Sequence, residues 1–491
     1  MSSYPLSKEF VIEYLSKVVG NANVLTEPEE LRKYSSDHSF VKPRMPLCVV
    51  KPGSIDEIQE IVKFANTYRI PLTPLSGGTN NLGGCIPSPN GIVIDLRRMN
   101  RIISMDTRAG MALIEPGVTF EQLQNEVLKH GLRVLTPAEL PKFSSVISTY
   151  LDLAPLYGWV YYGEENLTTM TIVLPTGEVI KTGQAAFPQI KWPYVSSHAS
   201  PFAGLANYIW FQSQGTLGIV AEGWVKLKPR GEVEKAFFVP VDKIENIYKI
   251  VRAIMWTRYP RDMVILNKFE TALMFTEESP SYSEKVKETF EVAPNWIIAF
   301  ILRHRKDAVE VMEEDLKDIA VKNGFKLLDE IPNIEKSPEK LIEEVRYPSG
   351  WPKWSKFKGA RTILPFIASL KDLPTIYNVA TKIAELYKYD TKNLGFTIIP
   401  TDRIGVVAVN ISISRDMYND EETSRLKKMY VELAEALVKV GAFYSRPYGV
   451  LAKIMYSRTQ NYYEVLMKLK RTIDPNNIMN PGRLNIAEEM I

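Results

Sequence analysis

Hydrophobic and polar residues along this chain follow two periods, which predicts a mixture of helices and strands. Apolar stripes at helical spacing predict helices over residues 10–19, 55–68 and 120–130. Ser54 stands at the N-cap of the second helix, Glu57 completes its capping box, and Gly131 ends the third helix. Short apolar runs predict strands over residues 46–50, 71–75, 91–96 and 111–115. The first part of the chain is therefore expected to be α+β, with mixed or antiparallel strands next to helices.

The second half of the chain repeats this alternation. Strands are expected at 235–239 and 296–302, and helices at 244–255, 308–322 and 462–472. The sequence Pro229-Arg230-Gly231-Glu232 interrupts the pattern and predicts a domain boundary. We therefore divide the chain into residues 1–230, 231–445 and 446–491.

Composition and charge exclude several classes of protein. Hydrophobic residues make up 45% of the 491 and charged residues 24%, as in ordinary soluble domains, and a net charge of +3 gives no reason to expect nucleic acid or an anionic membrane as partner. Two cysteines exclude a disulfide framework or an iron–sulfur site, and four scattered histidines lack the spacing of metal ligands. No apolar run reaches about 20 residues. We expect a cytoplasmic protein that could reach a membrane through a partner.

The segment from 74 to 84, Pro-Leu-Ser-Gly-Gly-Thr-Asn-Asn-Leu-Gly-Gly, is the most informative stretch. A strand that runs into glycines allows close approach of a ligand, and successive N–H groups can converge on a phosphate. Ser76, Thr79 and Asn80 would add side-chain donors. A tight hairpin is the alternative interpretation. The segment has neither the Gly-Lys-Ser/Thr of a P-loop nor the spacing of a dinucleotide fingerprint.

Further motifs follow this loop in a fixed order. They are Gly-Ile-Val-Ile-Asp-Leu at 91–96, Glu-Pro-Gly-Val-Thr at 115–119, Leu-Pro-Thr-Gly-Glu at 174–178, Gln-Gly-Thr-Leu-Gly-Ile-Val at 214–220 and Asn-Pro-Gly-Arg at 480–483. Together they resemble the vanillyl-alcohol oxidase/p-cresol methylhydroxylase superfamily of flavoproteins over nearly the whole chain. The segment 441–449 lacks the histidine-rich metal site of the glycolate and lactate dehydrogenase relatives, so the chain looks more similar to the vanillyl-alcohol oxidase and 4-cresol dehydrogenase branch.

The resemblance implies an FAD-binding domain of two subdomains over residues 1–230 and an α+β cap domain with an antiparallel sheet over 231–445. Residues 446–491 would return to the FAD domain. It also implies a set of FAD-binding residues, without a metal: Leu75, Ser76, Gly77, Gly78, Thr79, Asn80, Asn81, Leu82, Pro137, Ser145, Val146, Gly163, Gly218, Ile219, Val220 and Arg483.

The same resemblance implies roles for four charged residues. Arg483 would stabilise negative charge on the reduced flavin, with a solvated C-terminal arginine as the alternative. Arg446 matches an arginine that binds a phenolate, although its two tyrosine partners are replaced by Leu82 and Ser445. Arg361 replaces a histidine that carries the flavin in one branch, so we predict noncovalent FAD and place Arg361 near the flavin ring or an acidic substrate group.

Glu164 is the fourth residue and is expected to act as a base near the flavin. Two alternatives stay open: the base is the neighbouring Glu165, or both glutamates are solvated loop residues without a catalytic role. The second pyrophosphate loop departs from the family pattern, because residues 138–149 carry Pro141, Lys142 and Phe143 where glycines are usual. Such side chains would crowd the flavin or narrow access to it, and would then alter or abolish FAD binding.

The expected function is that of an FAD-dependent dehydrogenase or oxidase. It would oxidise a small alcohol, hydroxy acid or aromatic side chain and pass electrons to oxygen or to a protein such as a cytochrome or an iron–sulfur subunit. A homo-oligomer is compatible with the sequence. The alternatives are a subunit that holds FAD for electron transfer, or for structure, without its own catalysis, and a flavin-free scaffold.

Overall fold

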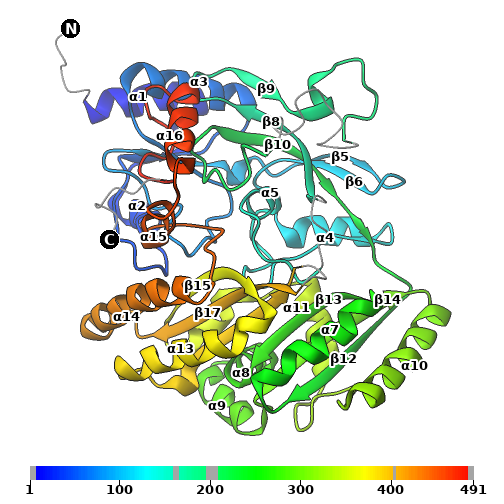
Figure 1. Cartoon of the computed structure of the whole chain (residues 1–491). Helices are drawn as coiled ribbons and strands as arrows, with labels where there is room; N and C mark the ends of the chain where they lie inside the picture. Colours follow the sequence, from blue (N-terminus) through cyan, green and yellow to red (C-terminus); the bar gives the residue numbers. More distant parts are fainter. Residues whose placement is uncertain (1–6, 159–164, 195–207, 402–404, 485–491) are drawn as a thin grey trace.

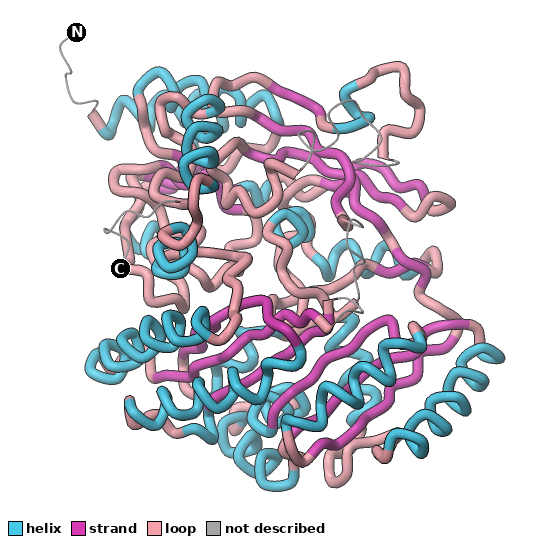
Figure 2. Tube along the Cα trace, viewed as in Figure 1, coloured by secondary structure: helices cyan, strands magenta, loops and turns pink. Residues whose placement is uncertain are grey.

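The computed structural model describes residues 7–158, 165–194, 208–401 and 405–484. Glu164 and Gly163 lie outside the described residues. The chain forms two parts, one above the other in Figure 1. The upper part contains the described residues up to about 230 together with the described C-terminal segment, and the lower part is built on one large sheet, as the strands and helices of Figure 2 show.

The upper part contains two principal sheets. The first has the order β1-β2-β4-β3, in which β4 pairs in parallel with both β2 and β3. The second is antiparallel with the order β5-β6-β10-β8-β9. The strands are β1 Val24–Leu25, β2 Cys48–Val50, β3 Leu72–Leu75, β4 Ile92–Asp95, β5 Ile102–Asp106, β6 Met111–Ile114, β8 Leu167–Val173, β9 Val179–Lys181 and β10 Ile219–Lys226. A short pair joins β7 Leu132–Arg133 to β11 Lys228–Pro229.

Helices cover these sheets as the apolar stripes predict. Helix α3, Ile55–Tyr68, begins where expected, because the Ser54 hydroxyl accepts a hydrogen bond from the amide of Glu57. Its apolar face packs on Ile92 and Ile94. The other helices of this part are α1 Lys8–Val19, α2 Pro28–Arg32, α4 Phe120–Leu128 and α5 Val146–Leu151.

The lower part is a six-stranded antiparallel sheet with the order β12-β14-β13-β16-β17-β15. Its strands are β12 Val233–Val241, β13 Pro260–Asn267, β14 Trp296–His304, β15 Ala360–Ser369, β16 Leu394–Pro400 and β17 Val406–Arg415. Strand β14 lies inside the sheet and is buried on both faces, which explains its continuous apolar run. The α+β fold with an antiparallel cap sheet is therefore confirmed.

Helices pack on both faces of the cap sheet. One face carries α7 Ile247–Thr257, α10 Lys306–Asn323, α13 Leu373–Leu386 and α14 Asp420–Lys439. The other carries α8 Lys268–Phe275, α9 Tyr282–Val292, α11 Ser337–Arg346 and α12 Gly350–Trp354. Neighbouring residues of β13 alternate between the two cores, with Ile265 in one and Leu266 in the other.

The C-terminal segment returns to the upper part through α15, Val450–Tyr456, and α16, Tyr462–Ile473. Asp474 caps the turn that follows by accepting from the amides of Ile478 and Met479, at 3.0 and 2.8 Å. The backbone of Leu72 then exchanges hydrogen bonds with Ile478 and Asn480, each 2.7 Å long. The Asp-Pro-Asn-Asn turn therefore adds the chain end to the free edge of β3, next to the predicted phosphate loop.

Candidate functional site

A cavity with about 1010 Å³ of empty space, partly open to solvent, lies in the upper part. The loop after β3, helix α5 and the segment before β10 form its walls. Among the residues predicted to bind FAD, those that line this cavity are Ser76, Gly77, Gly78, Thr79, Asn80, Gly218, Ile219 and Val220. The other described members of that prediction do not line it: Leu75, Asn81, Leu82, Pro137, Ser145, Val146 and Arg483.

The backbone of the loop fits a phosphate ligand. Within the described part of the chain, no acceptor receives a hydrogen bond from the amides of Ser76 to Asn80, although these residues line the cavity. Gly78 has a φ of +67°, a conformation that turns successive amides toward one side. Of these five residues only Thr79 is buried and Gly78 is exposed, so the amides can be reached by a ligand or by solvent. Five consecutive free donors therefore suit an anionic group such as a pyrophosphate.

The loop is supported from behind by the start of α5. Ser145 is the N-cap of this helix, and its hydroxyl donates to the carbonyl of Pro116 at 2.6 Å. A Cβ atom on Gly77 would lie only 2.7 Å from the amide nitrogen of Ser145. Ser145 therefore positions the loop, while the next turn of α5 lines the cavity through Ile147, Ser148 and Thr149.

Two amide side chains in the cavity were missed by the sequence reasoning. Gln214 and Asn480 line the cavity, and the buried Oε1 of Gln214 and Oδ1 of Asn480 have no hydrogen-bond partner within the described residues. Acceptors of this kind suit the N–H and O–H groups of a nucleotide. Asn480 belongs to the C-terminal motif, so only the return of the chain end brings it here.

The altered loop at residues 138–144 crowds the cavity less than expected. Of this stretch only Leu140 lines the cavity, and Phe143 is 48% exposed. The backbone packs instead against the cap, because the amide of Lys142 donates to the carbonyl of Pro348 and that of Trp351 donates to Glu139. This segment is therefore part of the contact between the two domains.

Arg483 lies behind the cavity. Its Nε and Nη2 donate to the carbonyls of Gly84 and Ile86, which keeps a buried guanidinium hydrogen-bonded. Burial lowers the pKa of Arg483. The expected contact with the flavin therefore stays a prediction, and the visible role of Arg483 is to hold residues 84–86.

A second cavity, with about 1530 Å³ of empty space that includes open solvent, lies between the cap sheet and the upper part. The residues that follow α5, from Leu153 to Leu156, form one wall. Pro365 and Ile367 on β15, Ile399 on β16 and Ala408 and Asn410 on β17 form the other. Glu165 also lines this cavity, next to the Glu164 of the sequence prediction, which is outside the described residues.

Arg446 lines both cavities, so the two spaces meet at its side chain. Its Nε donates to Oδ2 of Asp152 at 2.8 Å, and its Nη2 contacts the same oxygen. The hydroxyl of Tyr448 donates to the other carboxylate oxygen at 2.7 Å. Asp152, which the sequence reasoning did not single out, therefore pairs with the positive charge of Arg446.

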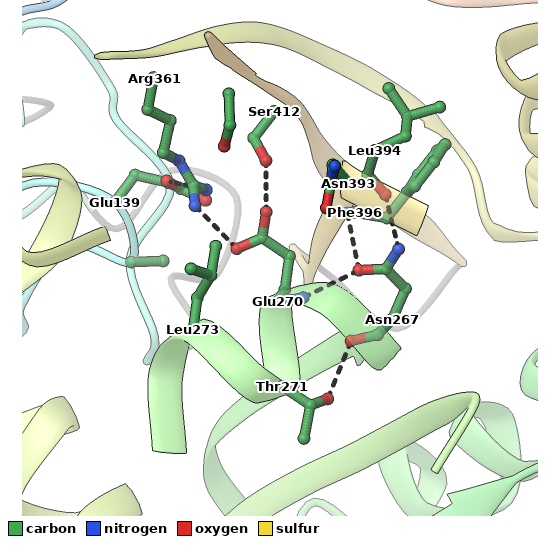
Figure 3. A network of polar contacts seen from close by, with 12 residues as sticks. Glu139, Asn267, Glu270, Thr271, Leu273, Arg361, Asn393, Leu394, Phe396 and Ser412 are labelled. Carbon is green, nitrogen blue, oxygen red and sulfur yellow. Dashed lines mark hydrogen bonds and ion pairs between the residues drawn. The ribbon is translucent and has the colours of Figure 1, made fainter. Parts of the chain in front are cut away.

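Arg361 does not line either cavity. It is fully buried on β15, where Nη1 donates to Glu270 and Nη2 to Glu139, each at 2.9 Å (Figure 3). Its guanidinium also lies 4.6 Å from the ring centre of Trp354, and the hydroxyl of Ser412 contacts Glu270. Two internal carboxylates thus take up the charge of Arg361, and its expected place near the flavin ring or an acidic substrate group stays a prediction.

Glu139 joins the domains in this network. Burial raises its pKa to about 7 from the ordinary value of 4.5, against the opposing effect of Arg361. Between these two values the folded protein binds a proton that the unfolded chain releases. The resulting contribution to the free energy of unfolding is therefore fully present below about pH 4.5 and decreases as the pH rises toward 7.

In Glu139→Gln this decrease in the free energy of unfolding with rising pH should be smaller. Denaturant titrations across the range test it, with the exposed Glu288→Gln as control, and equal slopes in wild type and Glu139→Gln would contradict the expectation.

The described residues contain neither a group of metal ligands nor a helix that could span a membrane. No three His, Cys, Asp or Glu side chains are grouped so that they could hold a metal ion. None of the described helices combines the length and the hydropathy of a membrane span.

Comparison with known proteins shows which families this chain matches. Residues 46–183 match the family described as FAD binding domain, and residues 359–484 match that of the C-terminal domain of FAD linked oxidases. The 4-cresol dehydrogenase [hydroxylating] flavoprotein subunit of Pseudomonas putida is 26% identical over 97% of this chain and 95% of its own. A glycolate oxidase subunit of Bacillus subtilis is 23% identical over 96% of both chains.

A D-lactate dehydrogenase of Anaerostipes hadrus is 24% identical over 99% of both chains. Among solved structures, p-cresol methylhydroxylase with substrate bound superposes with a TM-score of 0.83 at 21% identity, covering 97% of this chain and 96% of that one. At this identity the likeness shows the fold. Together, the two family matches, the relatives over nearly the whole chain and the shared fold show that the chain belongs to the vanillyl-alcohol oxidase/p-cresol methylhydroxylase superfamily of FAD-linked oxidoreductases.

Proposed function

We propose that this protein is an FAD-dependent dehydrogenase or oxidase that oxidises an alcohol or a benzylic carbon in the second cavity. The observation that carries the proposal is that the two cavities meet at Arg446. FAD, when bound, supplies a two-electron acceptor that takes a hydride at flavin N5. The amides of Ser76 to Asn80 would hold its pyrophosphate, with Gln214 and Asn480 as acceptors for other groups.

Noncovalent attachment of FAD remains part of the proposal. The described residues that line the first cavity include two groups able to attack a carbon, the thiol of Cys85 and the phenol of Tyr448. Burial raises the pKa of Cys85 to about 12 and that of Tyr448 further, which keeps both groups protonated and weakly nucleophilic. Arg361, at the position of the attached histidine, is ion-paired with Glu139 of the FAD domain and with Glu270 of the cap.

The second cavity favours a neutral, largely apolar substrate. Its described walls are mostly aliphatic and aromatic, with Asn166, Thr401, Asn410 and Ser445 as uncharged polar groups and Glu165 as an acidic one. Arg446, the cation that lines it, is paired with Asp152. A carboxylate or phenolate would have to compete with this internal carboxylate, whereas a neutral alcohol or an aromatic side chain would not. We therefore favour these substrates over a hydroxy acid.

Glu164 stays the proposed acceptor of the substrate hydroxyl proton. Support comes from its neighbour Glu165, which lines the cavity. Arg446 and Tyr448 would orient Asp152 and exclude water where the cavities meet. Electrons would then pass to oxygen or to an acceptor protein such as a cytochrome or an iron–sulfur subunit.

Anaerobic mixing of the FAD-loaded protein with candidate substrates tests the proposal. Benzyl alcohol and related neutral compounds should bleach the visible flavin absorbance, and glycolate or D-lactate should do so far more slowly or not at all. Light-driven reduction of the same sample shows that the flavin is competent. If light reduces the flavin but no compound of the panel does, the protein is better described as a subunit that holds FAD for electron transfer.

Asp152→Asn provides a matched variant. Loss of the carboxylate leaves Arg446 with an uncompensated charge, so small carboxylates should bind about tenfold or more tightly, as a charge-assisted hydrogen bond allows. Shifts of the flavin spectrum during titration with benzoate measure this binding without turnover. The exposed Asp318→Asn is the control. Unchanged benzoate affinity in Asp152→Asn would contradict the assignment of Asp152 as the partner of Arg446.

A further inference from the structure

A separate groove, with about 1010 Å³ of empty space open in part to solvent, lies where the two domains are joined. On the side of the FAD domain its walls come from β7 and β11, and on the side of the cap from the end of β14 and the start of β13. Six basic side chains line it: Arg133, Lys228, Arg261, Arg303, His304 and Arg305. Glu232 is the acidic residue in this lining.

The carboxylates behind the groove do not balance these charges. Asp262 accepts from Arg133 at 2.9 Å and from Arg303 at 2.6 Å. Glu234 contacts Arg303 and Arg346, and it lies 3.6 Å from Arg230. Two carboxylates are thus shared by four arginines, while Arg261 and Arg305 are exposed at the rim, where Arg305 lies 3.3 Å from the exposed Asp307. Even after Glu232 and Asp307 are included, the groove keeps an excess of positive charge.

Two observations indicate that an additional anion would stabilise the buried arginines. Arg133 is 6% exposed, and its buried Nε has no acceptor within the described residues. Burial lowers the pKa of Arg303 to about 8, and the positive charges of Arg133, Arg346 and Arg230 act in the same direction. An unpaired buried donor and crowded like charges both cost free energy. An anion in the groove would relieve both.

We propose that this groove is a binding site for a phosphate-type oxoanion, either inorganic phosphate or the phosphate group of a small molecule. Guanidinium groups bind such oxygens in pairs of parallel hydrogen bonds. Arg133 offers a fixed donor from the FAD domain, and Arg261 and Arg305 offer exposed donors from the cap. A bound dianion therefore bridges the domains beside their connection at Gly231. This site is separate from the two cavities of the proposed reaction and does not depend on it.

Calorimetric titration of the FAD-loaded protein with inorganic phosphate and with pyrophosphate tests the site, because bound FAD occupies the phosphate loop of the first cavity. Saturable binding is expected, and Arg261→Gln/Arg305→Gln should weaken it at least about tenfold, as loss of charge-assisted hydrogen bonds predicts. The exposed Arg425→Gln should bind as wild type does. Since the two rim residues are exposed, the double variant should fold and keep its flavin.

A second measurement separates binding in the groove from general screening by salt. Saturating phosphate should raise the midpoint of thermal unfolding by about 3 °C in wild type but not in the double variant, compared with sodium chloride at equal ionic strength. The two probes also separate the two sources of the anion. If inorganic phosphate binds more weakly than pyrophosphate, the natural ligand is better described as the phosphate group of a small molecule than as the free anion. Absence of heat for both anions, or equal affinity in wild type and double variant, would overturn the proposal.

Discussion

Gly77→Ala is expected to reduce FAD affinity at least about 100-fold, which corresponds to the loss of one or two charge-assisted hydrogen bonds. The new Cβ would lie 2.7 Å from the amide nitrogen of Ser145 and 3.4 Å from the Cα of Ser144. Both atoms belong to backbone that the N-cap of α5 and the hydrogen bond to Pro116 hold in place. The loop must therefore move, which shifts the amides of Ser76 to Asn80 from their positions along the cavity.

The ratio of flavin absorbance to protein after purification, followed by titration of the apoprotein with FAD, measures this effect. Gly324→Ala is a suitable control, because it changes a glycine at the end of α10 where a Cβ would have no neighbour within 4 Å. That variant carries some backbone strain, from a φ of +74°, but it should bind FAD normally. If Gly77→Ala bound FAD as tightly as wild type, the assignment of this loop to the pyrophosphate would be wrong.

Arg361→Met is expected to destabilise the protein by about 3–5 kcal/mol, the cost of leaving buried charge without its partner. Arg361 is fully buried between Glu139 and Glu270 (Figure 3), and it also contributes the contact with the ring of Trp354. Without the guanidinium, the site keeps two buried carboxyl groups with no positive partner, which must either take up protons or remain as unpaired charges. Urea unfolding of the FAD-loaded protein, followed by far-ultraviolet circular dichroism, measures the loss.

The companion variant Glu139→Gln/Glu270→Gln/Arg361→Met removes the charges together and should recover more than half of the lost stability. The deficit of Arg361→Met alone should also shrink as the pH falls, since protonation neutralises the remaining carboxylates. A deficit below about 0.5 kcal/mol, the range of ordinary surface substitutions, would show that the network is not a stabilising contact.

Local sequence patterns were sufficient for most elements of the fold. Helix α3 has the predicted bounds, because its cap and its apolar stripe are both encoded within one stretch of chain. The loop after β3 could be recognised for the same reason, since glycines and short polar side chains next to a strand end constrain the backbone locally. The ordered motifs indicated FAD and the superfamily, which the comparisons confirm.

Side-chain roles depended on contacts between segments far apart in the sequence. Arg361 was predicted to face the flavin or an acidic substrate, but Glu139 and Glu270, separated from it by 222 and 91 residues, take up its charge. Asp152 pairs with Arg446 across 294 residues, and no local pattern marks it. A sequence specifies backbone conformation through neighbouring residues, whereas the partner of a charge is decided only when the domains pack. The sequence therefore determined the fold and the cofactor, and the tertiary structure decided which cations remain available to a ligand.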